Sequence, residues 1–379
     1  MTQRGTTTEG RRTNMVGTGD RAAETAPGAA VESVRATTTG VWPGEEPRQA
    51  ASAGFSALAE AFVPVPLVST PAHGGTRWAA DLMGFAVQFL EGLPVDRSSF
   101  GWRLSRGTGA DLRIERSRFG RTLDALGEYG EGFTGRLLLT LPGPWELVHA
   151  LSLPDGNRVL GDHGARRDVV QSYAAGVAEL RVRMARLFDR PPRVRLLERH
   201  LDAILTGAVP TVSGYATLPA VPDAHVTAAL QSFLARSGPD TLLALPALGA
   251  VELSGKRVTH RSLLEATGAS AVEMPLRRLD ARGWEQSAEL VESGAEVWLG
   301  LPPDAGARPG DVRRWIAAIE EPWARIGMGR AGLRDFGITT GWEAPDALPP
   351  LLPESADPST AAGQGELAAR VVRALKESE

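Results

Sequence analysis

The sequence predicts one (β/α)8 barrel, an α/β fold, over residues 36–379, preceded by a disordered tail over residues 1–35. Two observations carry this prediction. Short apolar runs alternate with helical patterns, which is typical of parallel strands joined by right-handed helical crossovers. Several of the runs are continuous in Leu and Val, as expected for strands buried on both faces. Because eight such runs occur, a closed barrel is favoured over an open doubly wound sheet.

The eight expected strands lie at residues 36–41, 62–68, 136–141, 193–197, 241–245, 271–274, 296–301 and 336–340. The helix after Gly164 is the clearest, because Val169, Tyr173 and Val177 begin one apolar stripe that continues to Leu187. Further helices are expected at residues 226–235, 261–267, 284–293 and 311–326.

The two ends of the chain differ in composition from the barrel. Residues 1–35 carry hardly any large apolar side chain, so they cannot bury enough surface to offset chain entropy. Residues 348–365 are rich in Pro, Ala and Ser and are expected to form an irregular connection. Residues 366–376 place Leu367, Val371 and Leu375 at helical spacing, which predicts a terminal helix docked on the barrel.

The overall composition excludes several classes of function. With 42% hydrophobic and 23% charged residues, the chain has the make-up of a soluble globular protein. A net charge of −4 with dispersed Lys and Arg argues against a nucleic-acid partner. No apolar run approaches the roughly 18 residues of a membrane span, and no signal peptide is recognisable, so a cytoplasmic protein without membrane contact is expected. Since cysteine is absent, a thiolate zinc site cannot be built.

The sequence contains no established catalytic signature. Residues 327–332 match a dinucleotide-binding glycine pattern, but they follow a helix and precede a strand, so a helix stop is expected there. Residues 249–256 approach a phosphate-binding loop but have one residue too many between the glycines. Glu252 and His260, in the same loop-rich stretch, are interpreted as solvated polar residues.

In chain order, the expected strand ends and helix starts carry a series of short motifs. These are Thr39-Gly40-Val41-Trp42-Pro43-Gly44, Asp81-Leu82-Met83-Gly84, Leu93-Pro94-Val95-Asp96, Gly101-Trp102-Arg103-Leu104, Gly143-Pro144-Trp145, Gly164-Ala165-Arg166-Arg167-Asp168, Gly207-Ala208-Val209-Pro210-Thr211 and Leu279-Asp280-Ala281-Arg282-Gly283-Trp284. The series, within residues 37–342, resembles small actinobacterial proteins related to cobalamin-independent methionine synthase. That resemblance implies a (β/α)8 barrel of the type shared with uroporphyrinogen decarboxylase. It also implies zinc-dependent methyl transfer from a reduced folate to homocysteine.

The chain departs from this family where the resemblance places the zinc ligands. Ala244 and Pro246 occupy the positions of the family's His-x-Cys pair after the fifth strand. Pro275 stands near the position expected to carry an acidic ligand, and Thr340 occupies the position of the final Cys. The Asp-Glu-Pro motif after the fourth strand appears as Leu197-Glu198-Arg199. Ala, Pro and Thr offer zinc no usable donor set, so no metal site and no cofactor are predicted.

The polar and aromatic residues expected at the barrel mouth are the candidate ligand-binding residues; no catalytic residue is assigned. They are Trp42, Trp145, Glu198, His200, Asp304, Thr340, Trp342 and Glu343. The three tryptophans could stack on a planar ligand or be packing residues. Glu198 and His200, two positions apart in an extended segment, would share one face and could act as acid and base or bind an amine. A surface ion pair and a structural histidine are the alternative.

Two function classes follow. The first is a degenerate methionine synthase-like barrel without zinc-dependent homocysteine methyl transfer, a pseudoenzyme that retains at most a cleft for a folate-like or amino-acid-like molecule or for a protein partner. The alternative is an active methyltransferase of that family in methionine biosynthesis. Metal-free chemistry in the style of uroporphyrinogen decarboxylase is a third reading, for which the sequence identifies no arginine and aspartate set. Enzymatic activity is therefore left open.

Overall fold

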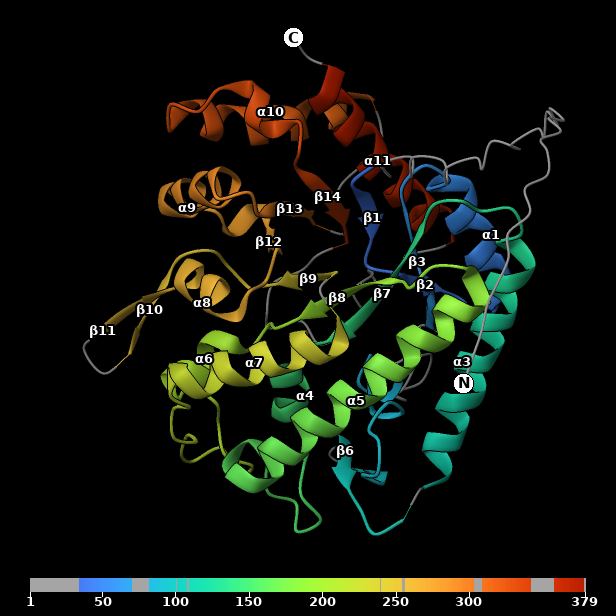
Figure 1. Cartoon of the computed structure of the whole chain (residues 1–379), viewed down its shortest axis with the longest axis vertical. Helices are drawn as coiled ribbons and strands as arrows, with labels where there is room; N and C mark the ends of the chain where they lie inside the picture. Colours follow the sequence, from blue (N-terminus) through green and yellow to red (C-terminus); the bar gives the residue numbers. More distant parts are fainter. Residues whose placement is uncertain are drawn as a thin grey trace, which may run out of the picture. The chain divides into compact units, whose positions relative to one another are not determined.

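The computed structural model describes residues 34–69, 82–99, 101–107, 109–238, 240–253, 256–302, 309–341 and 358–377. Within Ser33–Glu379, which form one unit, eight parallel strands make a nearly closed barrel surrounded by helices (Figure 1). The predicted fold class is thus confirmed. The predicted tail lies outside the described residues except for its last two. Val34, within the predicted tail, donates its backbone N–H to Glu60 O.

The barrel strands occur at all eight predicted places. They are β1 (Ala36–Thr38), β3 (Phe62–Pro64), β7 (Arg136–Pro142), β8 (Arg193–Leu197), β9 (Thr241–Ala244), β12 (Ala271–Pro275), β13 (Glu296–Leu301) and β14 (Gly337–Thr340). Their order in the sheet is β1-β14-β13-β12-β9-β8-β7-β3. The two edge strands meet where Thr37 Oγ1 donates to Phe62 O at 2.9 Å, which brings the sheet close to full closure.

The first two predicted strands are each broken in two. Beyond β1 and β3, the chain forms a separate parallel pair, β2 (Val41–Pro43) with β4 (Leu67–Ser69). Gly40, between β1 and β2, has a φ of +82°, a left-handed conformation that interrupts a strand and suits glycine. Pro66, between β3 and β4, has no N–H to donate to a ladder. Two antiparallel hairpins outside the barrel were not predicted: β5 (Val95–Ser98) with β6 (Gly101–Leu104), and β10 (Ala250–Leu253) with β11 (Lys256–Thr259).

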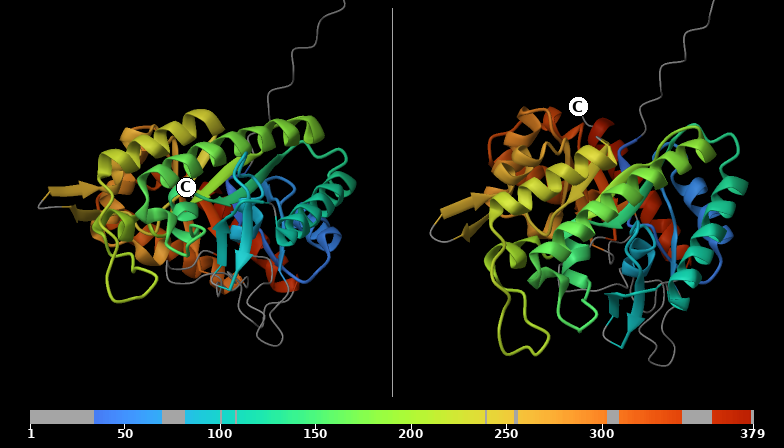
Figure 2. Two further views of the ribbon diagram at one scale, coloured as in Figure 1. Left: turned by 90° about the horizontal axis from the view of Figure 1, so that it is seen from below. Right: turned by 60° about the horizontal axis from the view of Figure 1, so that its bottom comes forward.

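The helices lie on the outside of the barrel (Figures 1 and 2). They are α1 (Pro47–Ala57), α2 (Leu82–Val87), α3 (Ala110–Tyr129), α4 (Pro144–Ala150), α5 (His163–Phe188), α6 (Leu201–Thr206), α7 (Asp223–Ser237), α8 (His260–Thr267), α9 (Ala281–Glu292), α10 (Pro309–Arg325) and α11 (Pro358–Glu377), with 3-10 turns η1 (Val159–Gly161), η2 (Leu276–Arg278) and η3 (Arg330–Leu333). No helix in the described ranges is both long and apolar enough to cross a bilayer.

One predicted connection is wrong in part: the terminal helix α11 already begins at Pro358, inside the stretch expected to be irregular. Proline is well tolerated in a first helical turn, and Ala361 and Ala362 favour the helix. The small side chain of Ala361 and the absence of one at Gly365 let α11 pack closely on α1, where a Cβ on Gly365 would contact Ala57 and Leu58.

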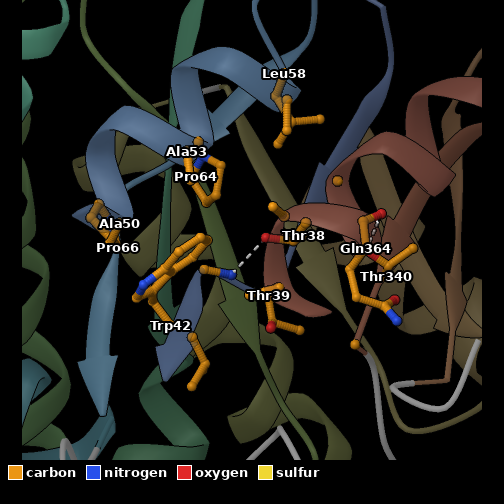
Figure 3. A pocket seen from close by; sticks show the side chains of 18 residues that line it. Thr38, Thr39, Trp42, Ala50, Ala53, Leu58, Pro64, Pro66, Thr340 and Gln364 are labelled. Atoms are coloured by element: carbon orange, nitrogen blue, oxygen red, sulfur yellow. Dashed lines mark hydrogen bonds between the residues drawn. The ribbon is translucent and has the colours of Figure 1, made fainter. Parts of the chain in front are cut away.

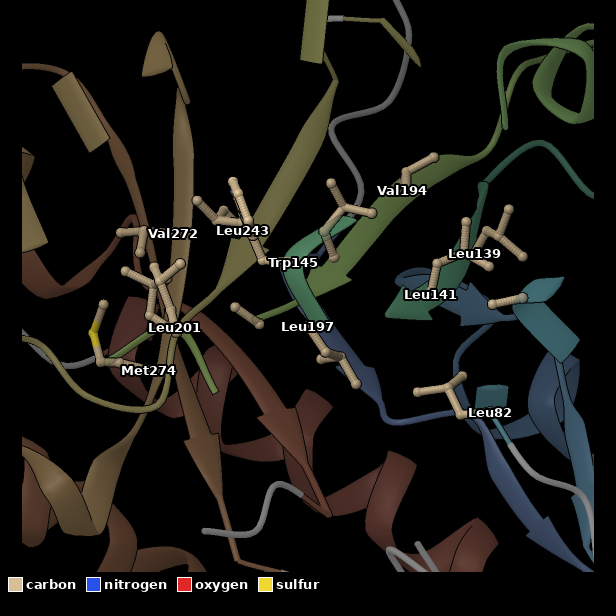
Figure 4. Packing of buried hydrophobic residues seen from close by; sticks show 14 of the residues in the cluster. Leu82, Leu139, Leu141, Trp145, Val194, Leu197, Leu201, Leu243, Val272 and Met274 are labelled. Atoms are coloured by element: carbon tan, nitrogen blue, oxygen red, sulfur yellow. The ribbon is translucent and has the colours of Figure 1, made fainter. Parts of the chain in front are cut away.

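Side chains alternate between the barrel interior and the surrounding helices, as a strand requires. Phe62, Leu138, Leu242, Ala271 and Trp298 form a separate apolar cluster drawn from five barrel strands. The intervening residues, among them Leu139, Val194 and Leu243, belong to the larger core with the helices (Figure 4). One layer of the interior is ionic: Arg195 of β8 binds Glu273 of β12 through Nε–Oε2 at 2.7 Å, and both side chains are fully buried.

Gly176 allows α5 to approach the chain at Phe89, and this contact supplies a stability prediction. A Cβ on Gly176 would overlap the main-chain oxygen of Phe89, whereas a Cβ on the exposed helical Gly127 would meet no atom within 4 Å. We therefore expect Gly176→Ala to lower the free energy of unfolding by about 1–3 kcal/mol. Gly127→Ala, the matched control in α3, should be neutral or stabilising by up to about 1 kcal/mol. Urea denaturation measures both; equal stability of the two variants would contradict the packing described.

Candidate functional site

The structure brings three of the predicted mouth residues together, namely Trp145, Glu198 and His200. Trp145 lies in the first turn of α4 after β7, Glu198 directly follows β8, and His200 precedes α6. The carboxyl ends of adjacent parallel strands meet at one edge of the barrel, which is where (β/α)8 proteins carry their chemistry. Asp304, Trp342 and Glu343 lie outside the described residues.

Glu198 holds the start of α4 in place. Its Oε1 accepts the backbone N–H of Trp145 at 3.0 Å and its Oε2 accepts that of Glu146 at 2.8 Å. Gly143 makes this approach feasible, because a Cβ there would overlap the Glu198 carboxyl group. Glu198 is fully buried, and burial raises its pKa well above the usual range, against the two N–H donors. Its carboxyl group thus caps a helix from the neighbouring strand.

The expectation that Glu198 and His200 share one face of an extended segment is wrong. The strand ends at Leu197, and His200 adopts φ −101° and ψ 13° at the start of α6. Both residues are held by contacts with α4 and not by a continued strand. Glu198 accepts from backbone N–H groups of α4, and His200 binds the side chain of Glu146 in the same helix.

Glu146 was not among the candidate residues, but it is the centre of a cluster with Arg199 and His200. It accepts from Arg199 Nη2 at 3.0 Å through Oε1, and its Oε2 lies 2.8 Å from His200 Nδ1. Its side chain is only 1% exposed. Burial works to raise the pKa of Glu146, but the hydrogen bond from His200 and the charge of Arg199 outweigh it, so the pKa is lowered. Glu146 is therefore a buried, ionised carboxylate.

A second histidine completes the arrangement. The ring of His149, from the last turn of α4, stacks on that of His200 with centroids 4.0 Å apart and planes 12° from parallel. Burial is the main cause that lowers the pKa of His149 to about 4, so this ring is neutral at neutral pH. The His200 side chain keeps 22% of its surface exposed, and His149 is also half-buried, so the two rings are the accessible part of the cluster.

The geometry defines what His200 can do chemically. Because Nδ1 faces a carboxylate, it carries the hydrogen, and Nε2 is then the unprotonated acceptor of the neutral ring. Glu146 also stabilises the imidazolium that would form if Nε2 took up a proton. A buried carboxylate behind an imidazole is the arrangement that enzymes use to orient a general base. The His200–Glu146 pair can therefore accept a hydrogen bond or a proton from a bound molecule.

The lowered pKa of His149 predicts a specific pH dependence of stability. In the unfolded chain His149 titrates near its usual 6.5, so that state takes up a proton first as the pH falls. The contribution of neutral His149 is thus complete above pH 6.5 and is lost as the pH drops towards 4. His149→Phe, which keeps a ring for stacking, should reduce this loss by about 2–3 kcal/mol across that window. Parallel pH-dependent urea curves for the two proteins would contradict the burial of a neutral imidazole.

Trp42 and Thr340 lie elsewhere, around a small cavity beside β1, α1 and α11 (Figure 3). Trp42 is 7% exposed, and Thr340 donates its hydroxyl to Gln364 O at 3.1 Å. The cavity measures about 30 Å³, enough for one or two waters. Trp145 is likewise buried, with its indole N–H donated to Val226 O at 3.2 Å. Stacking of these tryptophans on a planar ligand stays a prediction.

The residues at the implied zinc positions do not fit the metal. Ala244 and Pro275 are buried at the ends of β9 and β12, and Thr340 turns its oxygen towards α11. Glu273, two residues before Pro275 in the chain, is bound to Arg195. Within the described ranges, no three His, Asp or Glu residues are grouped so that they could hold a metal ion.

His260 is a further histidine whose interpretation changes. It was expected to be solvated, but it is 2% exposed and its Nε2 lies 2.6 Å from Asp202 Oδ1, while its Nδ1 accepts the N–H of Gly249. Both ring nitrogens of His260 have hydrogen-bond partners, which makes its burial possible. Glu252 is exposed, as expected.

Fold and site together define a (β/α)8 barrel that carries a buried carboxylate–imidazole pair at the carboxyl ends of β7 and β8. No family model and no curated protein matches the chain. The resemblance to cobalamin-independent methionine synthase therefore stays a prediction.

Proposed function

We propose that this protein is a zinc-independent descendant of methionine synthase-like barrels that binds a small organic molecule beside β7 and β8. The observation that supports the proposal best is the Glu146–His200 pair, in which a nearly fully buried carboxylate orients a partly exposed imidazole. The carboxylate of Glu146 is costly to desolvate, and its ion pair with Arg199 and its contact with His200 Nδ1 offset that cost.

The chemistry of the pair indicates the kind of ligand. Glu146 occupies Nδ1 of His200, so a ligand meets the ring at Nε2, which in the neutral form accepts from a hydroxyl, thiol or amine. A folate-like or amino-acid-like molecule, as the resemblance implies, carries such donors. Methyl transfer through zinc is not part of the proposal, because Ala244, Pro275 and Thr340 supply no ligand set. A cytoplasmic location and the absence of a nucleic-acid partner stay predictions from composition.

Calorimetric titration of the full chain with L-homocysteine and with 5-methyltetrahydrofolate tests the proposal. We expect at least one of these probes to bind, and we expect His200→Ala and Glu146→Gln to weaken that binding about tenfold, the value of one charge-assisted hydrogen bond. Tyr215→Ala, at a residue that is 97% exposed, is the control that should leave binding unchanged.

Two results would overturn the proposal. The first is binding of neither probe, or binding that both site variants leave intact. The second is stoichiometric zinc in protein purified without a metal-binding tag, accompanied by methyl transfer to homocysteine. That second result would establish the alternative, an active methyltransferase of the resembled family.

A further inference from the structure

A larger cavity lies outside the barrel, between α5 and α7. These two helices pack side by side (Figure 2). It measures about 300 Å³. Its apolar surface comes from Trp145, Val170 and Val221, together with alanines of α7. This volume is at the lower end of the range of small-molecule sites, and the apolar lining suits a hydrophobic ligand body.

The polar groups around this cavity are mostly basic. His163, Arg166 and Arg167 come from the first turns of α5, and His225 comes from the first turn of α7. None of the described residues that line the cavity is Asp or Glu. Two acids next to these residues in the chain are engaged: Asp162 caps α5 by accepting from Ala165 N at 2.7 Å, and Asp168 pairs with Arg167.

Arg166 is the best placed of these groups to bind a ligand. Its Nη1 donates to Leu160 O at 3.1 Å, which orients the guanidinium and uses one of its five N–H donors. The Arg167–Asp168 pair is solvent-exposed on both sides, and such pairs are weak enough to rearrange. The N-terminal ends of α5 and α7, helices of 26 and 15 residues, add to the positive electrostatic potential at the cavity.

We infer that this cavity binds an amphipathic organic anion, a carboxylate on an aromatic or aliphatic body, with the carboxylate held by Arg166. The apolar surface excludes a ligand that is only an anion, and the basic rim selects against a neutral one. A guanidinium and a carboxylate match in planar, two-point geometry. His200 does not line this cavity. Trp145 does, and its backbone N–H donates to Glu198, so the cavity adjoins the site described above.

The probes are 2-naphthoate and its neutral counterpart 2-naphthalenemethanol, titrated into the full chain and followed by calorimetry. We expect the acid to bind at least tenfold more tightly than the alcohol. Arg166→Gln should weaken binding of the acid about tenfold and leave that of the alcohol unchanged. Arg186→Gln, an exposed arginine in the last turn of the same helix, is the matched control and should change neither.

Ala229→Trp, on the α7 side of the cavity, is a second variant that should abolish binding by filling the space. An unchanged thermal unfolding transition shows that this variant folds. Equal affinity for acid and alcohol would overturn the inference. Undiminished binding of the acid by Arg166→Gln would overturn it as well. Competition by inorganic phosphate at the same concentration as naphthoate would also overturn it, since the site would then recognise charge alone. The outcome is independent of homocysteine or folate binding at His200.

Discussion

Replacing Glu273 by leucine is expected to lower the free energy of unfolding by about 3–5 kcal/mol, the largest effect of any single change considered for this barrel. Glu273 and Arg195 are both 0% exposed and form two hydrogen bonds inside the barrel. The variant leaves the guanidinium of Arg195 in a low-dielectric interior without its carboxylate. Because arginine cannot release its proton, it cannot escape this cost by neutralisation.

The double variant Arg195→Met with Glu273→Leu is the matched control. Removing both charges eliminates the desolvation cost, so its stability should return to within about 1 kcal/mol of the parent or exceed it. Urea denaturation of the parent, the single variant and the double variant measures the difference. A single variant as stable as the double one would show that the two side chains are not a buried ion pair.

The second large effect is expected at Glu198, whose replacement by leucine should cost about 2–4 kcal/mol. The change leaves the backbone N–H groups of Trp145 and Glu146 buried without an acceptor. Glu198→Gln retains one acceptor oxygen and should cost about half as much. Glu292→Leu, the same substitution at an exposed helix end, should stay within about 0.5 kcal/mol of the parent. Thermal or urea unfolding distinguishes these outcomes, and equal costs at Glu198 and Glu292 would contradict the capping role.

The sequence was a good guide to the barrel because its strands are short and apolar between polar loops. The run at 296–301 agrees with β13 residue for residue, and the stripe beginning at Val169 marks α5. Helices α1 and α3 were not predicted. In α3 the apolar positions are widely spaced among charged residues, so its pattern is weak over a short window even though Phe119 and Leu126 are buried.

The candidate site was harder to predict, because its contacts join residues far apart in the chain. Glu146 meets Arg199 and His200 across 53 and 54 residues, and no local pattern signals such a meeting. A carboxylate two residues after Gly143-Pro144, at a strand end, was the available signal. Glu198 was a candidate ligand-binding residue, but its partners are backbone N–H groups, which every residue except proline offers.

The ionic layer of the barrel was missed for a related reason. β8 alternates Arg193 and Arg195 with apolar residues, a pattern that normally indicates a half-exposed strand. In this barrel the face carrying both arginines is the interior one. Arg193 binds Glu296 and Arg195 binds Glu273, carboxylates that lie 103 and 78 residues further along the chain.

The most direct test of the account is the nitrogen-15 NMR spectrum of the histidine rings, with the His200 signals assigned by their loss in His200→Ala. If Glu146 orients the ring, neutral His200 carries its hydrogen on Nδ1, where Glu146 accepts it, and leaves Nε2 unprotonated. A neutral His200 with its hydrogen on Nε2 would contradict the carboxylate–imidazole pair on which the proposed binding site depends.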